Sequence, residues 1–216
     1  MEIAKTHHES GLGIYAESKP VKTKDDWKKA KEVSHETIAF MDEHNGSFDG
    51  HHSKAYALAH CQVAPVSDPW QFFVVDKSMV YGKQKEKDPR MTLKNALFEA
   101  QAIFNAEILE APTHIKKEVP QRIVTRDEND RTQVSVEVGK ETQTLKNMVA
   151  VPEACMSFPL RKARNTERYY EIKVRYQYIG KLGMVKTFTG WVSGLKAHII
   201  QHETDHFQGK NIFHKK

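Results

Sequence analysis

The chain has 216 residues, of which 39% are apolar and 28% charged, and its formal net charge is +5. No run approaches the roughly 18 to 20 apolar residues needed to cross a bilayer, so a membrane-spanning protein is excluded and no membrane partner is expected. The positive surplus is small and spread along the whole chain, which favours a solvated basic surface over a groove for DNA or RNA.

Cysteine content and the N-terminal residues indicate the compartment. Only Cys61 and Cys155 occur, too few for a scaffold held by disulfides, so a reducing compartment is favoured. The N-terminus carries Glu2, Glu9 and Glu17 and lacks an apolar core, which argues against a targeting segment. We therefore expect a cytoplasmic protein.

The first half of the chain predicts one long helix and one buried strand. Between residues 24 and 44, apolar and small residues recur at spacings of three and four, the pattern of an amphipathic helix. These residues are Trp27, Ala30, Ser34, Ile38 and Met41. The turn-forming residues 45–50 end this helix, and the short apolar run at 72–76 predicts a buried strand.

The second half predicts antiparallel strands and a final helix. Residues 91–109 fit either a helix or a strand, whereas residues 132–138 and 169–178 alternate cleanly and predict strands. A turn at 180–183 returns the chain as a hairpin into residues 184–192. After Ser193, a candidate N-cap, apolar residues at helical spacing predict the last helix: Leu195, Ile199, Ile200 and Phe207. The fold class is α+β, with antiparallel strands packed around the C-terminal helix.

The sharpest chemical signal is the sequence HETDH at residues 202–206. Its two histidines stand at positions i and i+4 of the predicted helix, so both imidazoles can reach one cation, and Glu203 can face a water on that cation. In a chain with 12 histidines, the alternative is a surface helix with paired charges. We interpret the pattern as a metal site.

A catalytic metal site needs a third protein ligand and an open position. His198 stands four residues before His202, on the same face of the predicted helix. It lies about 12 Å along the helix from His206, too far for the two to share an ion. The chain matches the longer zinc-protease pattern HExxHxxGxxH at Gly209. It has Ile212 at the position of the third histidine, so the pattern is not complete. Cys155 is the better candidate, because a thiolate is a good ligand for Zn(II) or Fe(II).

Three ordered motifs make the chain resemble the peptide deformylase family. The family carries GxGLAAxQ, EGCLS and QHExDH; this chain has AYALAHCQ at 55–62, EACMS at 153–157 and QHETDH at 201–206. The third motif matches fully, and the short segment after it resembles the compact, phage-type members.

The other two motifs depart from the pattern. In the second, Ala154 stands for Gly and Met156 for Leu, and in the first, Ala55 and Ala57 replace both glycines while His60 replaces an alanine. The resemblance implies one deformylase-like domain over residues 1–216. Residues 77–152 are longer than the matching family segment, so insertions are expected within them.

The resemblance also implies a role for individual residues. The metal ligands would be Cys155, His202 and His206. Glu203 would take a proton from a water in the fourth place, and the Gln62 side chain and the backbone N–H of Met156 would hold the oxyanion.

Further residues follow by the same resemblance. Tyr56, Ala57 and Ile199 would line the substrate site, and Glu153 would bond the far nitrogen of a ligand histidine. The helical spacing, and not the resemblance, places Asp205 one residue off the face of His202 and His206, so it is expected to pair with a basic residue such as Arg168.

The implied reaction removes the formyl group from N-formylmethionyl peptides emerging from ribosomes and releases formate. The implied cofactor is one divalent ion, Fe(II) in the cell, with Zn(II), Ni(II) or Co(II) as stable substitutes. Two alternatives remain open at this point. One is an HExxH-type zinc protease, and the other is a catalytically silent binding module that keeps the fold.

Overall fold

In this computed structural model, the described residues are 2–3, 17–44, 55–64, 68–87, 98–126, 133–155, 157–158 and 162–213. The predicted turn at 45–50 and residues 91–97 lie outside these ranges. None of the helices within them has the length and apolarity that crossing a bilayer requires.

The predicted N-terminal helix is confirmed as α1, Lys24–His44. Thr23 and Asp26 cap its start reciprocally: the Asp26 amide donates to Thr23 Oγ1 at 3.1 Å, and the Thr23 amide donates to Asp26 Oδ2 at 3.0 Å. This capping box satisfies two donors that the first turn leaves without partners. The predicted buried face includes Ala30, Ser34 and Met41, all at most 1% exposed.

The central sheet has five antiparallel strands in the order β11-β10-β5-β4-β2. Their bounds are β2 Ala57–Ala59, β4 Phe72–Val75, β5 Ala102–Glu110, β10 Glu171–Ile179 and β11 Val185–Ser193. The expected strand at 72–76 and the hairpin turning at 180–183 are confirmed. The sequence pattern of residues 91–109 fitted either a helix or a strand, and in the structure this stretch forms β5 from residue 102 onward.

Shorter elements connect these strands and pair among themselves. Strand β1, Glu2–Ile3, pairs with β3, Val63–Ala64, which follows the short helix η2, His60–Gln62. Helix α2 spans Lys77–Lys87. Strands β8, Met148–Glu153, and β9, Arg164–Tyr169, form a separate pair.

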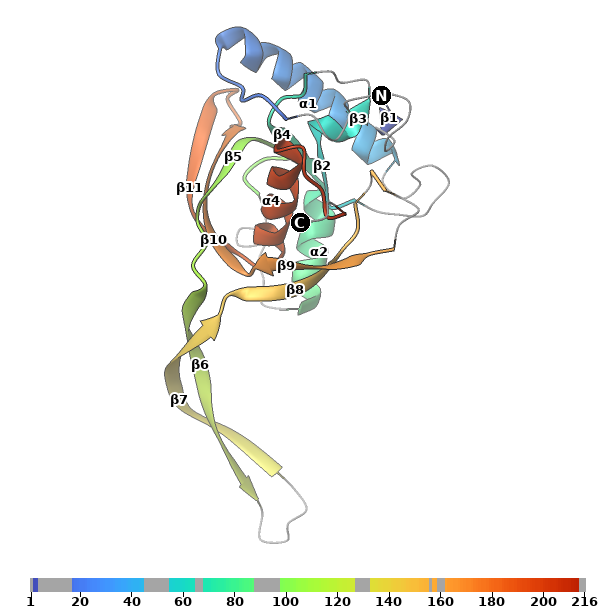
Figure 1. Cartoon of the computed structure of the whole chain (residues 1–216). Helices are drawn as coiled ribbons and strands as arrows, with labels where there is room; N and C mark the ends of the chain where they lie inside the picture. Colours follow the sequence, from blue (N-terminus) through green and yellow to red (C-terminus); the bar gives the residue numbers. More distant parts are fainter. Residues whose placement is uncertain are drawn as a thin grey trace.

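The C-terminal helix α4, Leu195–Phe207, occupies the middle of the molecule (Figure 1). It contacts strands β2, β5, β9 and β11 and helix α2. Its buried side chains join one core cluster with the inner faces of the sheet, including Ala197, Ile200 and Phe207. The α+β fold with antiparallel strands around the last helix is therefore confirmed.

The start of α4 differs from the prediction. Ser193 is the last residue of β11, and the N-cap is Gly194, whose φ of 63° favours glycine. The strand thus runs directly into the helix, and a left-handed residue makes the sharp turn between them. The Ser193 cap was wrong by one position.

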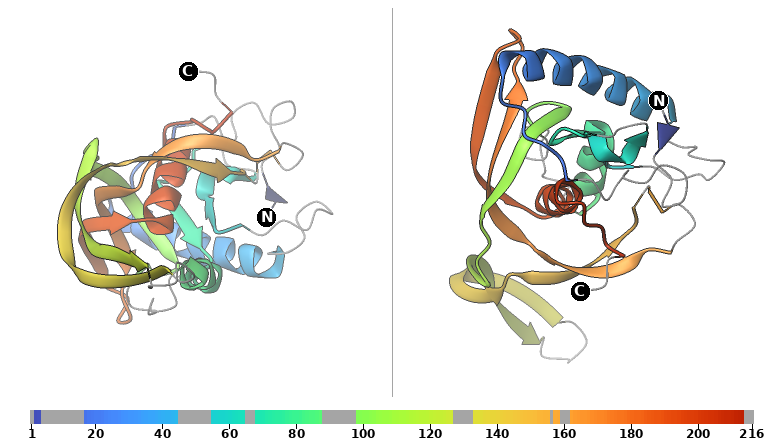
Figure 2. Two further views of the ribbon diagram at one scale, coloured as in Figure 1. Left: turned by 90° about the horizontal axis from the view of Figure 1, so that it is seen from below. Right: turned by 45° about the horizontal axis from the view of Figure 1, so that its top comes forward.

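A long two-stranded ribbon projects from the body (Figures 1 and 2). It consists of β6, His114–Arg126, and β7, Gln133–Lys146, paired in antiparallel register. The sequence predicted strand only for residues 132–138, so most of the ribbon was missed. It lies inside the range 77–152, and we propose it as one of the insertions expected there.

Asn147 fixes the base of the ribbon. Its fully buried side chain donates to the carbonyls of Pro112 and Glu171, both at 2.7 Å, and accepts from the Glu171 amide at 2.8 Å. Strand β8 begins at the next residue, so the ribbon and the start of β8 share one anchored junction.

Candidate active site

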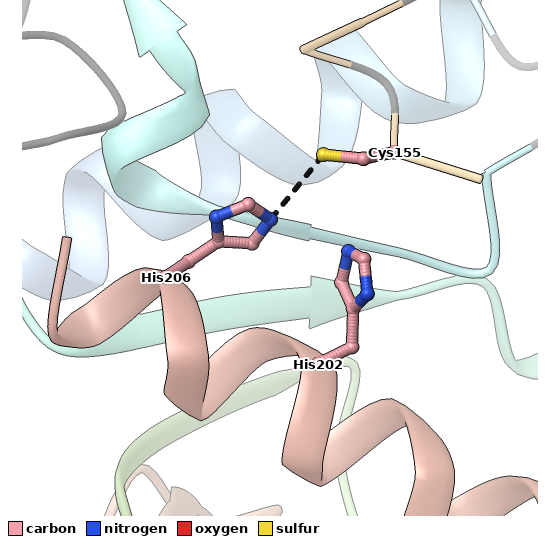
Figure 3. A group of neighbouring side chains, drawn as sticks. All are labelled: Cys155, His202 and His206. Carbon is pink, nitrogen blue, oxygen red and sulfur yellow. Dashed lines mark hydrogen bonds between the residues drawn. The ribbon is translucent and has the colours of Figure 1, made fainter. Parts of the chain in front are cut away.

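Three side chains with metal-binding atoms converge beside α4 (Figure 3). Cys155, His202 and His206 each offer one ligand atom, and these three atoms lie within 4.8 Å of one another. The Cys155 sulfur is 3.5 Å from His206 Nε2, and the two imidazole centroids are 4.9 Å apart. One thiolate and two imidazoles at this separation form a donor set that suits a single Zn(II) or Fe(II) ion.

Two separate elements bring these candidate ligands together. The histidines face the same way because they are four residues apart on α4, whereas Cys155 follows the end of β8. Cys155 and His206 are 4% and 0% exposed. The sulfur and the two imidazoles are therefore close enough to share one ion.

A buried ionic network orients His202. Its Nδ1 lies 3.2 Å from Glu153 Oε2. Arg168 donates two hydrogen bonds to the same carboxylate, at 2.8 and 2.9 Å, and a third to Asp205 at 2.7 Å. With Nδ1 engaged by a carboxylate, Nε2 of His202 is the nitrogen left to face the other ligands.

The electrostatics of this network keep Glu153 ionised. Burial alone would raise the pKa of Glu153, but hydrogen bonds from His202 and Arg168 outweigh burial and lower the pKa to about 2. Arg168 cannot lose its own proton near neutral pH. The Glu153 carboxylate therefore remains a hydrogen-bond acceptor for the imidazole.

Glu203 is buried next to the ligand set. It is 3% exposed, and within the described ranges its Oε2 has no hydrogen-bond partner. Burial raises the pKa of Glu203 to about 7, against the opposing charge of His202. A carboxyl group with a pKa near neutrality can both accept and return a proton.

Gln62 reaches the centre from η2. Its Oε1 accepts from the Ala59 amide at 2.8 Å, which turns the NH₂ group toward Ser157 Oγ at 3.2 Å and the Cys155 sulfur at 3.6 Å. An amide donor therefore lies beside the ligand set. Met156, the other expected oxyanion donor, lies outside the described residues.

A cleft of about 430 Å³ opens onto this centre. Its lining includes Tyr56, Ala57 and Ile199, the three residues expected to contact substrate, together with Gln62 and Glu203. Residues that sequence reasoning did not place there also line it, among them Val151, Phe158, Leu195 and His198. Leu195 and His198 could have been found by extending the row of His202 toward the helix start at spacings of three and four.

The whole chain, residues 1–216, matches the family model described as polypeptide deformylase. The chain belongs to the polypeptide deformylase family. This membership makes it an enzyme of a metal-dependent hydrolase family, as the resemblance implied. A direct search of curated proteins finds no match.

Solved peptide deformylases share the fold. The enzyme of Thermotoga maritima is 22% identical, with a TM-score of 0.51 and coverage of 95% of this chain and 96% of that chain. A probable peptide deformylase of Synechococcus phage S-SSM7 is 19% identical, with a TM-score of 0.53 and coverage of 98% and 96%. Peptide deformylase 1B of Arabidopsis thaliana is 17% identical, with a TM-score of 0.54 and coverage of 99% and 80%.

His60 is a departure from the deformylase motif with a clear packing role. It is 5% exposed, stacks on Phe72 at 4.6 Å and Trp70 at 5.8 Å, and its Nδ1 accepts from the Trp70 amide at 3.0 Å. Burial lowers the pKa of His60 to about 4. The neutral imidazole is thus part of the native packing that holds η2 and Gln62.

Acid should weaken this packing. The unfolded chain protonates His60 below pH 6.5 while the folded chain resists until about pH 4, so its contribution is complete above pH 6.5 and is lost as the pH falls through this window. The full loss is about 3 kcal/mol of unfolding free energy.

We expect His60→Asn, which keeps an acceptor but does not titrate, to flatten the fall in stability between pH 6.5 and 4. Urea unfolding of both proteins across this range provides the measurement. Parallel curves for the two proteins would contradict the assignment to His60.

Removing Arg168 should loosen the ligand set. Arg168→Met would leave Glu153 without its fixed partner and free the His202 ring to rotate, and outer partners of this kind typically change metal affinity by about 10- to 100-fold. We expect weaker binding of Ni(II) in a competition titration against a chelating dye. Arg175→Met is the matched control, because its ion pair with Glu107 at 2.6 Å is exposed and such pairs contribute little. Equal affinities in the two variants would show that Arg168 does not position the ligands.

Proposed function

We propose that this chain removes the N-formyl group from N-formylmethionyl peptides of nascent proteins and releases formate. The observation that carries the proposal is the convergence of Cys155, His202 and His206 within 4.8 Å, beside a buried Glu203 that lines the cleft. Family membership supports the same reaction class.

The residues present fit a metal ion. The buried thiol of Cys155 and the imidazoles of His202 and His206, the first of them oriented by a carboxylate, would hold one divalent ion. When bound, a divalent cation supplies Lewis-acid activation of water and of the formyl carbonyl. Fe(II) is our proposal for the ion in the cell, with Zn(II), Ni(II) or Co(II) able to replace it.

Glu203 carries the proton through the reaction. It takes a proton from the attacking water as the new C–O bond forms at the formyl carbon. It then gives that proton to the amide nitrogen as the C–N bond breaks, because an amine leaves far more readily than its anion. The products are formate and a peptide with a free N-terminal methionine.

Two hydrogen-bond donors, one from η2 and one from the segment after β8, stabilise the oxyanion that forms at the formyl carbon. The Gln62 amide, already held by the Ala59 backbone, supplies one hydrogen bond, and we assign a second to the backbone N–H of Met156. One donor of this type typically contributes about 3 kcal/mol to barrier lowering.

Substrate binding and cellular setting complete the proposal. Tyr56, Ala57 and Ile199 contact the peptide in the cleft. The family motif has glycine at the position of Ala57, so this chain places one additional methyl group there. The enzyme acts in the cytoplasm of a bacterial or phage-infected cell, on chains near the ribosome exit region.

One experiment separates this proposal from a zinc protease and from a silent binding module. Purified protein loaded with Ni(II) or Co(II) is incubated with a formyl-Met dipeptide and, separately, with a peptide carrying an internal amide bond. Formate release from the dipeptide alone is the expected result. Internal cleavage would indicate a protease, and neither product would indicate a protein without hydrolytic activity.

A further inference from the structure

The cleft continues beyond the catalytic centre along α4. Its lining follows one face of the helix through Leu195, His198, Ile199, His202 and Glu203. His198 lies one turn, about 6 Å along the axis, toward the helix start from the ligand His202. An unbranched side chain the length of methionine bridges such a gap when its formyl group is at the centre.

Away from the catalytic centre, the described lining of the cleft is apolar with two exceptions. Its walls include Val151, Phe158 and Leu195. Outside the catalytic centre and its Glu153 partner, only Tyr56 and His198 bring side-chain polar atoms to the described lining. An apolar pocket with few polar groups selects ligands by hydrogen bonding at those groups.

Neighbouring residues hold the His198 ring in place. It packs edge-on against Tyr170, with centroids 6.5 Å apart and an interplanar angle of 73°. Tyr170 in turn lies under the Lys117 ammonium, 3.8 Å from its ring centroid. Lys117 belongs to β6, so the anchored base of the ribbon supports this wall of the cleft.

The chemistry of both polar residues favours an acceptor on the ligand. An imidazole carries at least one N–H donor in either protonation state, and a phenol carries an O–H donor. Both residues can therefore donate a hydrogen bond to an acceptor atom at the end of the substrate side chain.

We propose that His198 is a specificity-determining residue that selects a first residue whose side chain ends in a hydrogen-bond acceptor. The thioether sulfur of methionine is a weak acceptor, and the oxygen of methionine sulfoxide is a strong one. The inference rests on the proposed deformylase function, and it predicts that N-formyl peptides beginning with methionine sulfoxide are substrates.

The test compares two dipeptides that differ in this acceptor, formyl-methionine sulfoxide-Ala and formyl-norleucine-Ala. For the Ni(II)-loaded protein, kcat/KM is measured for both, and the ratio of sulfoxide to norleucine is the readout. His198→Phe and His198→Leu should lower this ratio about tenfold, the value of one hydrogen bond. His198→Gln, which restores a donor, should recover much of it.

A ratio unchanged in the Phe and Leu variants would overturn the inference. If kcat/KM has fallen equally for both substrates, the unchanged ratio indicates a packing role for His198. Affinities of the two dipeptides for the metal-loaded Glu203→Gln protein, with and without His198→Phe, give the same ratio without turnover. If no formate appears from either substrate, the proposed function fails, while this binding ratio still decides the role of His198.

Discussion

Glu203→Gln is expected to abolish deformylation while the metal stays bound. The change keeps the size of the side chain and removes its ability to take and return a proton. General acid–base groups contribute about 10²- to 10⁴-fold to rate, and Glu203 serves in both steps, so we expect a loss of about 10³-fold or more in kcat. Formate release from a formyl-Met dipeptide gives the rate, and elemental analysis of the same sample gives the metal content.

A matched control tests whether the loss of turnover is specific to position 203. Glu167→Gln makes the same chemical change at an exposed residue of β9, and it should keep wild-type turnover. Activity near wild type in the Glu203 variant would refute its role. Loss of metal together with activity would instead assign Glu203 to holding the ligand set.

Cys155→Ser should remove or change metal binding. A serine hydroxyl is a far weaker ligand than a thiolate for zinc or ferrous iron, and the two histidines alone leave the ion with half of a tetrahedral set. We expect less than stoichiometric metal after dialysis against a mild chelator. With Co(II), the charge-transfer absorption of a thiolate ligand should disappear.

The second cysteine provides the control. Cys61 is also buried, at 1% exposed, and its thiol contacts the His206 carbonyl at 3.7 Å, but it is absent from the converging set. Cys61→Ser should therefore lower stability through a buried hydroxyl and keep one metal per chain and the thiolate absorption. If both variants retain metal and absorption, Cys155 is not a ligand.

Helix α1, strand β4 and the β10–β11 hairpin could be predicted because their determinants are local. The spacing of Trp27, Ala30 and Met41 has the period of a helix, and the apolar run at 72–76 suits a buried strand. The histidine pair His202 and His206 is also determined locally. A spacing of four residues on one helix fixes the distance between the two imidazoles before any tertiary contact forms.

The β6–β7 ribbon was largely missed for a physical reason. Residues 114–126 include Lys116, Lys117, Glu118 and Pro120, a composition that disfavours strands. Their hydrogen bonds come from register with β7, and periodicity within β6 does not report that pairing. Similarly, the cap at Ser193 was misplaced because the left-handed turn at Gly194 depends on how β11 meets the helix.

By itself, the sequence determined the α1 and α4 helices, several strands, the ordered motifs and the identity of the candidate ligands. Only the tertiary structure decided three contacts. Cys155 lies beside the two histidines of α4, Arg168 donates hydrogen bonds to Glu153 as well as to Asp205, and His198 lines the cleft. These contacts join residues from different elements, and their distances depend on how β8, β9 and α4 pack. Periodicity reports the direction of a side chain within its own element, and packing decides what that side chain meets.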